Sequence, residues 1–264
     1  MKILFVLNQK YTYFSYFESA IRSLLDKGHT IELHLYQEYS NKHQLALDNF
    51  LEEGMNMRVC WVPERDDIWR RPIQFVRDLI HYSFIISQSH QNEYHVALYL
   101  KRLTKNRILK LLFSLGIVKL IIKQQLIKKL FSFLSSFVFP LNKDAIKSIH
   151  NFEPDIVIAT PGNFTQPDEL DYLEVAKACG IKTVIPIYSW DNLAFKGSLQ
   201  FVPDWLFVWN EYQMNEAIEY HNVPKEKVVI IGSTVFDKWF HLEDYLLTRE
   251  ELFNRFNFDP AKNY

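Results

Sequence analysis

Two short polar segments in the second half of the chain carry the side chains best suited to chemistry. Residues 188–197 read Tyr-Ser-Trp-Asp-Asn-Leu-Ala-Phe-Lys-Gly, and residues 232–237 read Gly-Ser-Thr-Val-Phe-Asp. Each directly follows a run of residues that predicts a β-strand, 183–187 in the first case and 228–231 in the second. Because open α/β sheets bind ligands at the carboxyl ends of their strands, we expect both segments to lie at a binding cleft.

The 188–197 segment combines an aromatic ring, an acceptor, an amide and a cation within seven residues. This set suits a sugar or a phosphorylated substrate. Asp191 is the candidate general base, because a carboxylate can take the proton of an acceptor hydroxyl. We expect Trp190 to stack on a sugar, Asn192 to bind a hydroxyl and Lys196 to bind a phosphate. The alternative, equally weighted, is an ordinary loop in which Asp191 or Asn192 caps the next helix and Trp190 is a buried anchor.

Loops after other predicted strands supply further candidates for substrate binding. For the loop that carries Asn163 and Thr165, an ordinary turn at Pro161-Gly162 is an equally good explanation. The candidates are Asn163 and Thr165 after strand 156–160, Asn8 and Lys10 after strand 2–7, and Gly232, Ser233 and Thr234 at the cleft.

Composition restricts the class of protein. The chain has 264 residues, is 48% hydrophobic and 23% charged, and has a net charge of −1, which gives no overall signature of nucleic-acid binding. Cys60 and Cys179 lie far apart and fit no metal-ligand spacing, so we expect no metal site and two buried cysteines in a reducing compartment. The apolar run at residues 1–7 is too short for a secretion signal and predicts a first strand, so a cytoplasmic location is expected.

Strand-like and helix-like segments alternate along most of the chain. The first 62 residues read strand, helix, strand, helix, strand, with a predicted helix at 41–53 and with Gly28 ending the first helix. The order resumes at 155–160 and continues to about residue 231, with Gly180 ending another helix. This alternation predicts an α/β fold, a Rossmann-like and mainly parallel sheet of six or seven strands. Residues 69–150 contain no convincing strand and predict a central helical insertion. Residues 248–257 predict a short helix capped by Thr248 with Glu251.

The middle of the chain is strongly basic. Between residues 94 and 143 there are ten Lys or Arg residues and no Asp or Glu, interleaved with long apolar runs. Such a pattern suits an acidic membrane surface, and peripheral attachment to the inner face of the membrane is one interpretation. The other interpretation is a set of packed helices with solvated lysine tips, because the charges are poorly segregated on a helical wheel. Nine of these ten cations are candidates for contact with a membrane: Lys101, Arg102, Lys105, Arg107, Lys110, Lys119, Lys123, Lys128 and Lys129.

Taken together, these features resemble the N-terminal, acceptor-side domain of a glycosyltransferase of the GT-B fold. Residues 232–237 are similar to the Gly-Asn-Thr-Val-Ile-Asp stretch of UDP-N-acetylglucosamine 2-epimerases, which share that fold. The segment from Ser189 to Gly197 is similar to one in bacterial surface-polysaccharide transferases and in the CDP-glycerol glycerophosphotransferase family. The resemblance implies half of a GT-B fold, at residues 1–240, followed at 241–264 by a linker towards a missing C-terminal domain.

Two departures from the family pattern qualify the expected function. The epimerase motif His-Val-Glu-Ala-Gly-Leu-Arg is absent, and Pro-Ile-Tyr-Ser-Trp-Asp-Asn stands in its place at 186–192, which counts against epimerase chemistry. No nucleotide-phosphate loop is visible, so no cofactor is expected on this chain and the nucleotide-sugar donor is expected in the missing domain or subunit. The resemblance thus implies the acceptor side of a sugar transferase in surface polysaccharide biosynthesis, inactive alone. The alternatives are a glycerophosphotransferase-like or epimerase-like enzyme, or a non-catalytic membrane-associated subunit.

Overall fold

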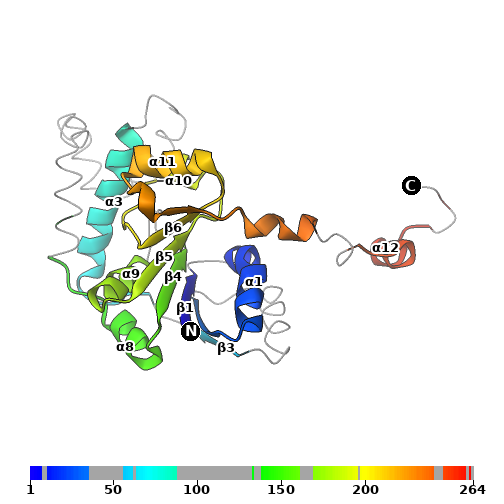
Figure 1. Ribbon diagram of the computed structural model, residues 1–264, viewed down its shortest axis with the longest axis horizontal. Coiled ribbons are helices and arrows are strands. Elements are labelled where there is room, and N and C mark those ends of the chain that lie inside the picture. The colour runs from blue at the N-terminus through cyan, green and yellow to red at the C-terminus, as the bar shows by residue number, and fades with distance from the viewer. Residues whose placement is uncertain are drawn as a thin grey trace.

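A computed structural model of the chain describes residues 1–7, 11–35, 56–61, 64–87, 133, 138–160, 169–195, 197–240, 246–259 and 262. Its centre is a seven-stranded sheet in the order β3-β2-β1-β4-β5-β6-β7, and every neighbouring pair of strands is parallel (Figure 1). The predicted α/β, Rossmann-like parallel sheet is therefore confirmed.

The strands and helices follow the predicted alternation. The strands are β1 (Lys2–Leu7), β2 (Thr30–Leu35), β3 (Met57–Trp61), β4 (Ile156–Thr160), β5 (Lys182–Pro186), β6 (Trp205–Val208) and β7 (Val228–Ile230). The α-helices are α1 (Tyr11–Asp26), α3 (Arg70–Ser87), α8 (Lys143–Phe152), α9 (Glu169–Ala178), α10 (Asn192–Phe195), α11 (Glu211–His221) and α12 (Arg249–Phe256), and the 3₁₀ helices are η1 (Lys225–Lys227) and η2 (Thr234–Trp239).

Glycine and capping signals end and begin the helices as predicted. Gly28, at φ 80°, lets the chain leave α1, and its N–H donates to the Leu25 carbonyl at 2.8 Å. Gly180, at φ 71°, has the same role after α9. At α12 the predicted capping box is present, since the Thr248 side chain accepts from the Glu251 N–H and the Glu251 carboxylate accepts from the Thr248 N–H.

Alternating residues of the strands form two cores on opposite faces of the sheet. Leu4 and Val6 of β1 pack with residues from α8, α9, α10 and α11. Ile3, Phe5 and Leu7 pack instead with Phe17 and Ile21 of α1 and with β2. Helix α1 covers one face, and α8 and α9 lie on the other (Figure 1).

A buried ionic network joins elements that are distant in the sequence. The Asp171 carboxylate of α9 accepts hydrogen bonds at 2.7 Å from Arg77 of α3 and from Asn142, the N-cap of α8. Arg65 lies 3.7 Å from the same carboxylate and donates to the Pro140 carbonyl at 2.9 Å. Because removing one partner from such a network strands a buried charge, the network fixes how these helices sit.

The cysteines were expected to be buried, and this was wrong: Cys60 is half-buried and Cys179 is exposed. Cys179 follows the last residue of α9, where the buried face of the helix has already ended.

Of the predicted central insertion, α3 and α8 are described and are helical. The predicted helix at 41–53 and the basic residues from Lys101 to Lys129 lie outside the described residues.

Candidate functional site

The 188–197 loop begins with a tight turn at the carboxyl end of β5. The Asn192 N–H donates to the Ser189 carbonyl at 3.2 Å, and the Ser189 hydroxyl donates to the Asp191 carboxylate. The Trp190 side chain is 67% exposed, which excludes the buried-anchor alternative. Asp191 is half-buried, whereas Asn192, the first residue of α10, is fully buried. The turn therefore presents an aromatic ring beside an oriented carboxylate.

Side chains just before and within the first turn of α11 form hydrogen bonds to the backbone of this loop. The Trp209 indole N–H donates to the Ile187 carbonyl at 2.7 Å. The Gln213 amide donates to the Ser189 carbonyl at 3.0 Å and accepts from the Trp209 N–H at 2.8 Å. Gln213 is buried, so both of its hydrogen bonds are made away from bulk water. The backbone at Ile187 and Ser189 is thus fixed by side chains that follow β6.

His221, the last residue of α11, fixes the other end of the loop. Its Nδ1 accepts from the Leu199 N–H at 3.0 Å, so its Nε2 carries the proton and donates to the Leu193 carbonyl at 2.8 Å. The ring is buried and stacks on Phe84 of α3 at 4.8 Å between centroids. The 188–197 loop is therefore connected through α11 to the α3 layer.

Burial also raises the pKa values of two carboxyl groups, one in α3 and one in α11. It raises the pKa of Asp78 in α3 to about 7, because burial removes hydration that stabilises the charged form. It also raises the pKa of Glu216 in α11. Both groups therefore hold their protons to a higher pH than exposed carboxyls do.

The 232–237 segment, by contrast, lies on α1. The Thr234 hydroxyl donates to the Tyr16 carbonyl, and the Ser19 hydroxyl donates to the Asp237 carboxylate at 2.9 Å. Phe236 meets the Trp209 ring edge-to-face, with centroids 5.6 Å apart. Gly232 turns the chain at φ 79°, a conformation that favours glycine.

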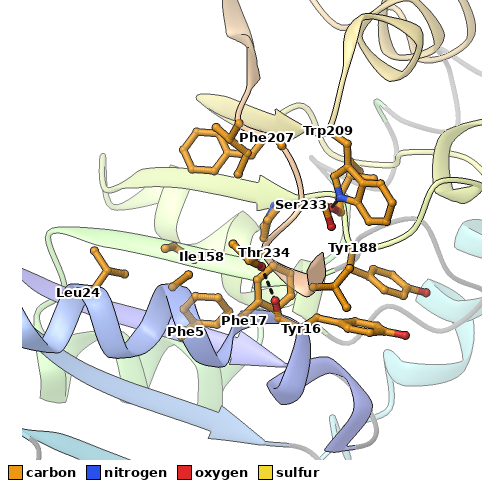
Figure 2. A pocket seen from close by; sticks show the side chains of 16 residues that line it. Phe5, Tyr16, Phe17, Leu24, Ile158, Tyr188, Phe207, Trp209, Ser233 and Thr234 are labelled. Atoms are coloured by element: carbon orange, nitrogen blue, oxygen red, sulfur yellow. Dashed lines mark hydrogen bonds between the residues drawn. The ribbon is translucent and has the colours of Figure 1, made fainter. Parts of the chain in front are cut away.

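A cavity of about 130 Å³ lies between this segment, α1 and the sheet (Figure 2). Its walls are mainly aromatic and aliphatic, and the Tyr16 and Tyr188 rings stack at 5.8 Å along one side. Gly232, Ser233 and Thr234 line it together with Tyr188. The cavity lies at the carboxyl ends of β5, β6 and β7, and Tyr188 is the residue of the 188–197 segment that lines it. Trp190, Asp191 and Asn192 are not among the lining residues. An apolar cavity with aromatic walls can accommodate the ring face of a sugar or another apolar group.

Five predicted binding residues cannot be placed in this site. Asn8, Lys10, Asn163, Thr165 and Lys196 lie outside the described residues. Their roles remain predictions, as does a contact of buried Asn192 with an acceptor hydroxyl.

Sequence reasoning missed the residues that support the loop: Trp209, Gln213, His221 and Tyr16. One signal was present. Asn210 caps α11, and Gln213 stands at the third helical position, a spacing typical of a capping box. In this protein, however, the Gln213 side chain reaches the Trp209 N–H and the neighbouring loop.

The chain was compared with proteins of known sequence and structure. No protein-family model and no curated protein sequence matches it. Its structure is similar to the UDP-GlcNAc 2-epimerase of Neisseria meningitidis bound to UDP-GlcNAc, with a TM-score of 0.51 and 15% sequence identity over 100% of this chain. The chain spans 56% of that epimerase chain. Glycosyltransferase VinC in complex with dTDP also matches, at 14% identity over 70% of this chain and 34% of that chain, but its TM-score of 0.30 supports no argument.

The epimerase match confirms the fold that the sequence predicted. The chain has the Rossmann-like architecture of one half of a GT-B fold. At 15% identity the match concerns the fold alone. Among the described helices, none has both the length and the hydropathy that a membrane span requires.

Proposed function

We propose that the chain is the acceptor-side half of a GT-B glycosyltransferase, which transfers a sugar from a nucleotide-sugar donor during surface polysaccharide assembly. The observation that carries this proposal is the turn after β5, where exposed Trp190 lies next to the half-buried Asp191 carboxylate. The similarity of this segment to surface-polysaccharide transferases supports the choice of pathway.

The proposed chemistry assigns one role to each side chain of the turn. The acceptor sugar packs against the Trp190 ring, and the Asp191 carboxylate takes the proton of its hydroxyl. The hydroxyl oxygen then forms a bond to the anomeric carbon of the donor sugar, whose bond to the nucleotide phosphate breaks. The Ser189 hydroxyl, bonded to Asp191, orients the carboxylate.

We place the donor nucleotide on a second domain or subunit that faces this one. Two observations support this: the chain spans 56% of the similar epimerase chain, and the cavity beside Tyr188 is apolar. Calorimetry with UDP-, GDP- and CDP-linked sugars tests the proposal. The 264-residue chain alone should show little affinity, and adding the donor-binding domain should restore both binding and turnover. Micromolar binding by this chain alone would contradict the assignment.

Membrane attachment is proposed for the basic residues from Lys101 to Lys129. It rests on their charge, since each cation near an anionic surface contributes about 1 kcal/mol. The chain should co-sediment with anionic vesicles at low salt and dissociate at high salt. Equal binding to neutral and anionic vesicles would favour the solvated-lysine interpretation.

Epimerase chemistry is the second candidate, favoured by the structural match over the whole chain. It predicts inversion at C2 of UDP-GlcNAc with no acceptor present, which proton NMR can follow. Sugar transfer requires an acceptor and leaves C2 unchanged, so a single assay of the complete enzyme separates the two candidates.

A further inference from the structure

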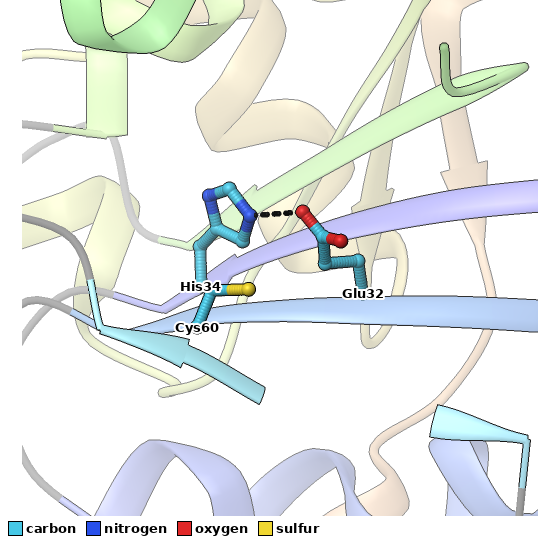
Figure 3. A group of neighbouring side chains, drawn as sticks. All are labelled: Glu32, His34 and Cys60. Atoms are coloured by element: carbon cyan, nitrogen blue, oxygen red, sulfur yellow. Dashed lines mark hydrogen bonds and ion pairs between the residues drawn. The ribbon is translucent and has the colours of Figure 1, made fainter. Parts of the chain in front are cut away.

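Three potential metal ligands meet on the opposite half of the sheet from the 188–197 loop. They are Glu32 and His34 of β2 and Cys60 of β3 (Figure 3). One oxygen, one nitrogen and one sulfur atom from these residues all lie within 4.8 Å of one another. Among the described residues, this is the group of three whose ligand atoms come close enough to share an ion.

The parallel register of two strands produces this cluster. His34 stands directly opposite Cys60, and Glu32 lies two residues earlier on the same face of β2. Glu32 and His34 are 5% and 1% exposed, whereas Cys60 is half-buried. The sequence gives no sign of this group, because Cys60 lies 26 residues after His34 and no motif joins it to Glu32 and His34.

Hydrogen bonds orient the histidine ring as metal-binding histidines are oriented. Nε2 lies 2.6 Å from the Glu32 carboxylate, and Nδ1 lies 3.2 Å from the Tyr172 hydroxyl of α9. The Tyr172 hydroxyl also donates to Ser148 at 3.4 Å, so its oxygen can accept a proton from Nδ1. The 2.6 Å contact between Nε2 and the Glu32 carboxylate is a hydrogen bond in the metal-free protein. If the proton moves to Nδ1 and is donated to Tyr172, the lone pair of Nε2 becomes available to a metal ion. Ligating histidines commonly donate their second nitrogen to such a partner.

We propose that Glu32, His34 and Cys60 bind one zinc ion between β2 and β3. Thiolate, imidazole and carboxylate are the ligands that zinc takes in proteins, usually in tetrahedral geometry. Tetrahedral zinc requires ligand atoms roughly 3.2–3.7 Å apart. In the metal-free protein the separations run from 2.6 Å up to at most 4.8 Å, so zinc binding requires the Nε2–carboxylate distance to widen and the longest distance to shorten. Three protein ligands leave a fourth position for water or another group.

Zinc binding at this site must release protons. Zinc binds cysteine as the thiolate, so the thiol of Cys60 is the proton source. The thiol proton passes to the buffer as the Zn–S bond forms. Arg58 lies 3.5 Å from the second oxygen of Glu32, but its side chain is 75% exposed and can turn into the solvent. The ion would link the edge strand β3 to β2. It would also link β3 to α9, because His34 contacts Tyr172 of that helix.

The test uses the full chain, freed of metal by a chelator and then titrated with zinc chloride or cobalt chloride. Calorimetry should show one zinc ion per chain, with proton release that depends on the buffer. Cobalt should give the near-ultraviolet absorption of a cobalt–thiolate bond. Cys60→Ser should abolish that absorption and weaken zinc binding more than tenfold, while Cys179→Ser, the matched control at the exposed cysteine, should change neither. Tyr172→Phe should weaken zinc binding about tenfold, as loss of a group that orients a ligand does.

Two results would overturn the proposal. One is the absence of cobalt–thiolate absorption from the wild-type chain, and the other is its persistence in Cys60→Ser. Far-ultraviolet circular dichroism of Cys60→Ser confirms that the variant is folded, so a lost signal reports a lost ligand. Either of these two results would mean that Glu32, His34 and Cys60 form a hydrogen-bonded part of the core and do not bind zinc.

Discussion

The two segments that looked alike in the sequence are held in different ways. The 188–197 loop contains buried residues and receives hydrogen bonds from Gln213 and His221, which are themselves buried. The 232–237 segment is half-buried to exposed and is fixed to α1 through Thr234 and Asp237. Catalytic groups need supporting side chains that lock their geometry. The comparison therefore favours the proposal that the chemistry lies in the loop after β5, whereas the segment after β7 lines the cavity.

The largest expected effect on stability comes from removing the support of the loop. His221→Phe keeps the ring that stacks on Phe84 but leaves the Leu199 N–H and the Leu193 carbonyl without their partner. We expect the free energy of unfolding to fall by about 2–5 kcal/mol, since each buried group left unpaired costs about 1–3 kcal/mol. Denaturant unfolding measures it. The control His150→Gln, at an exposed histidine, should change stability by less than about 0.5 kcal/mol. Equal effects of the two changes would mean that the loop is not supported by α11.

The α3 layer that carries Phe84 should make the stability depend on pH. Burial raises the pKa of Asp78 from 3.8 in the unfolded chain to about 7 in the native state. Between these values the native state keeps a proton that the unfolded chain has lost, so stability should fall as pH rises from about 4 to 7. Asp78→Asn should therefore be more stable than wild type at pH 8, by roughly 2–4 kcal/mol, with little difference at pH 4. Urea unfolding across this pH range is the measurement.

The matched control for this pH dependence is Asp26→Asn, at an exposed carboxyl at the end of α1. It should leave the pH profile of wild type unchanged. A profile that is the same for Asp78→Asn and wild type would show that the pKa of Asp78 does not differ between the native and unfolded states.

A smaller effect is expected on acceptor affinity, which should depend on the 188–197 loop and not on η2. Trp190 and Trp239 are exposed tryptophans, at 67% and 60%, one in the loop and one in η2. Trp190→Ala should weaken acceptor binding about three- to tenfold, because an aromatic contact contributes about 0.5–1.5 kcal/mol. Stability should be unchanged, since the ring is outside the core. Trp239→Ala should leave acceptor affinity as it is, and equal losses in the two variants would contradict the comparison.

The fold could be read from the sequence because its signals are local. Apolar runs marked the strands, and Gly28 and Gly180 marked two helix ends, so the seven-stranded parallel sheet was within the predicted range. The capping box at Thr248 and Glu251 was equally local.

The support of the site could not be read in this way, because it depends on contacts between distant residues. Gln213 reaches a loop 24 positions earlier, and His34 meets Cys60 only through strand register. The exposure of Cys179 depended on where the buried face of α9 ends, which composition does not reveal. Trp190 shows the same limit, since the exposure of the ring, which its residue type does not reveal, excluded the buried-anchor alternative.

The most direct test compares the two carboxylates, one in each segment, in the complete enzyme. Asp191→Asn keeps the shape and the hydrogen bond to Ser189 but cannot take a proton, so turnover should fall by about 10²–10⁴-fold with folding intact. Asp237→Asn, which alters the contact with Ser19, should leave turnover within about tenfold of wild type. Single-turnover rates with acceptor and donor measure both. An unchanged rate in Asp191→Asn, or an equal loss in Asp237→Asn, would contradict the assignment of the chemistry to the loop after β5.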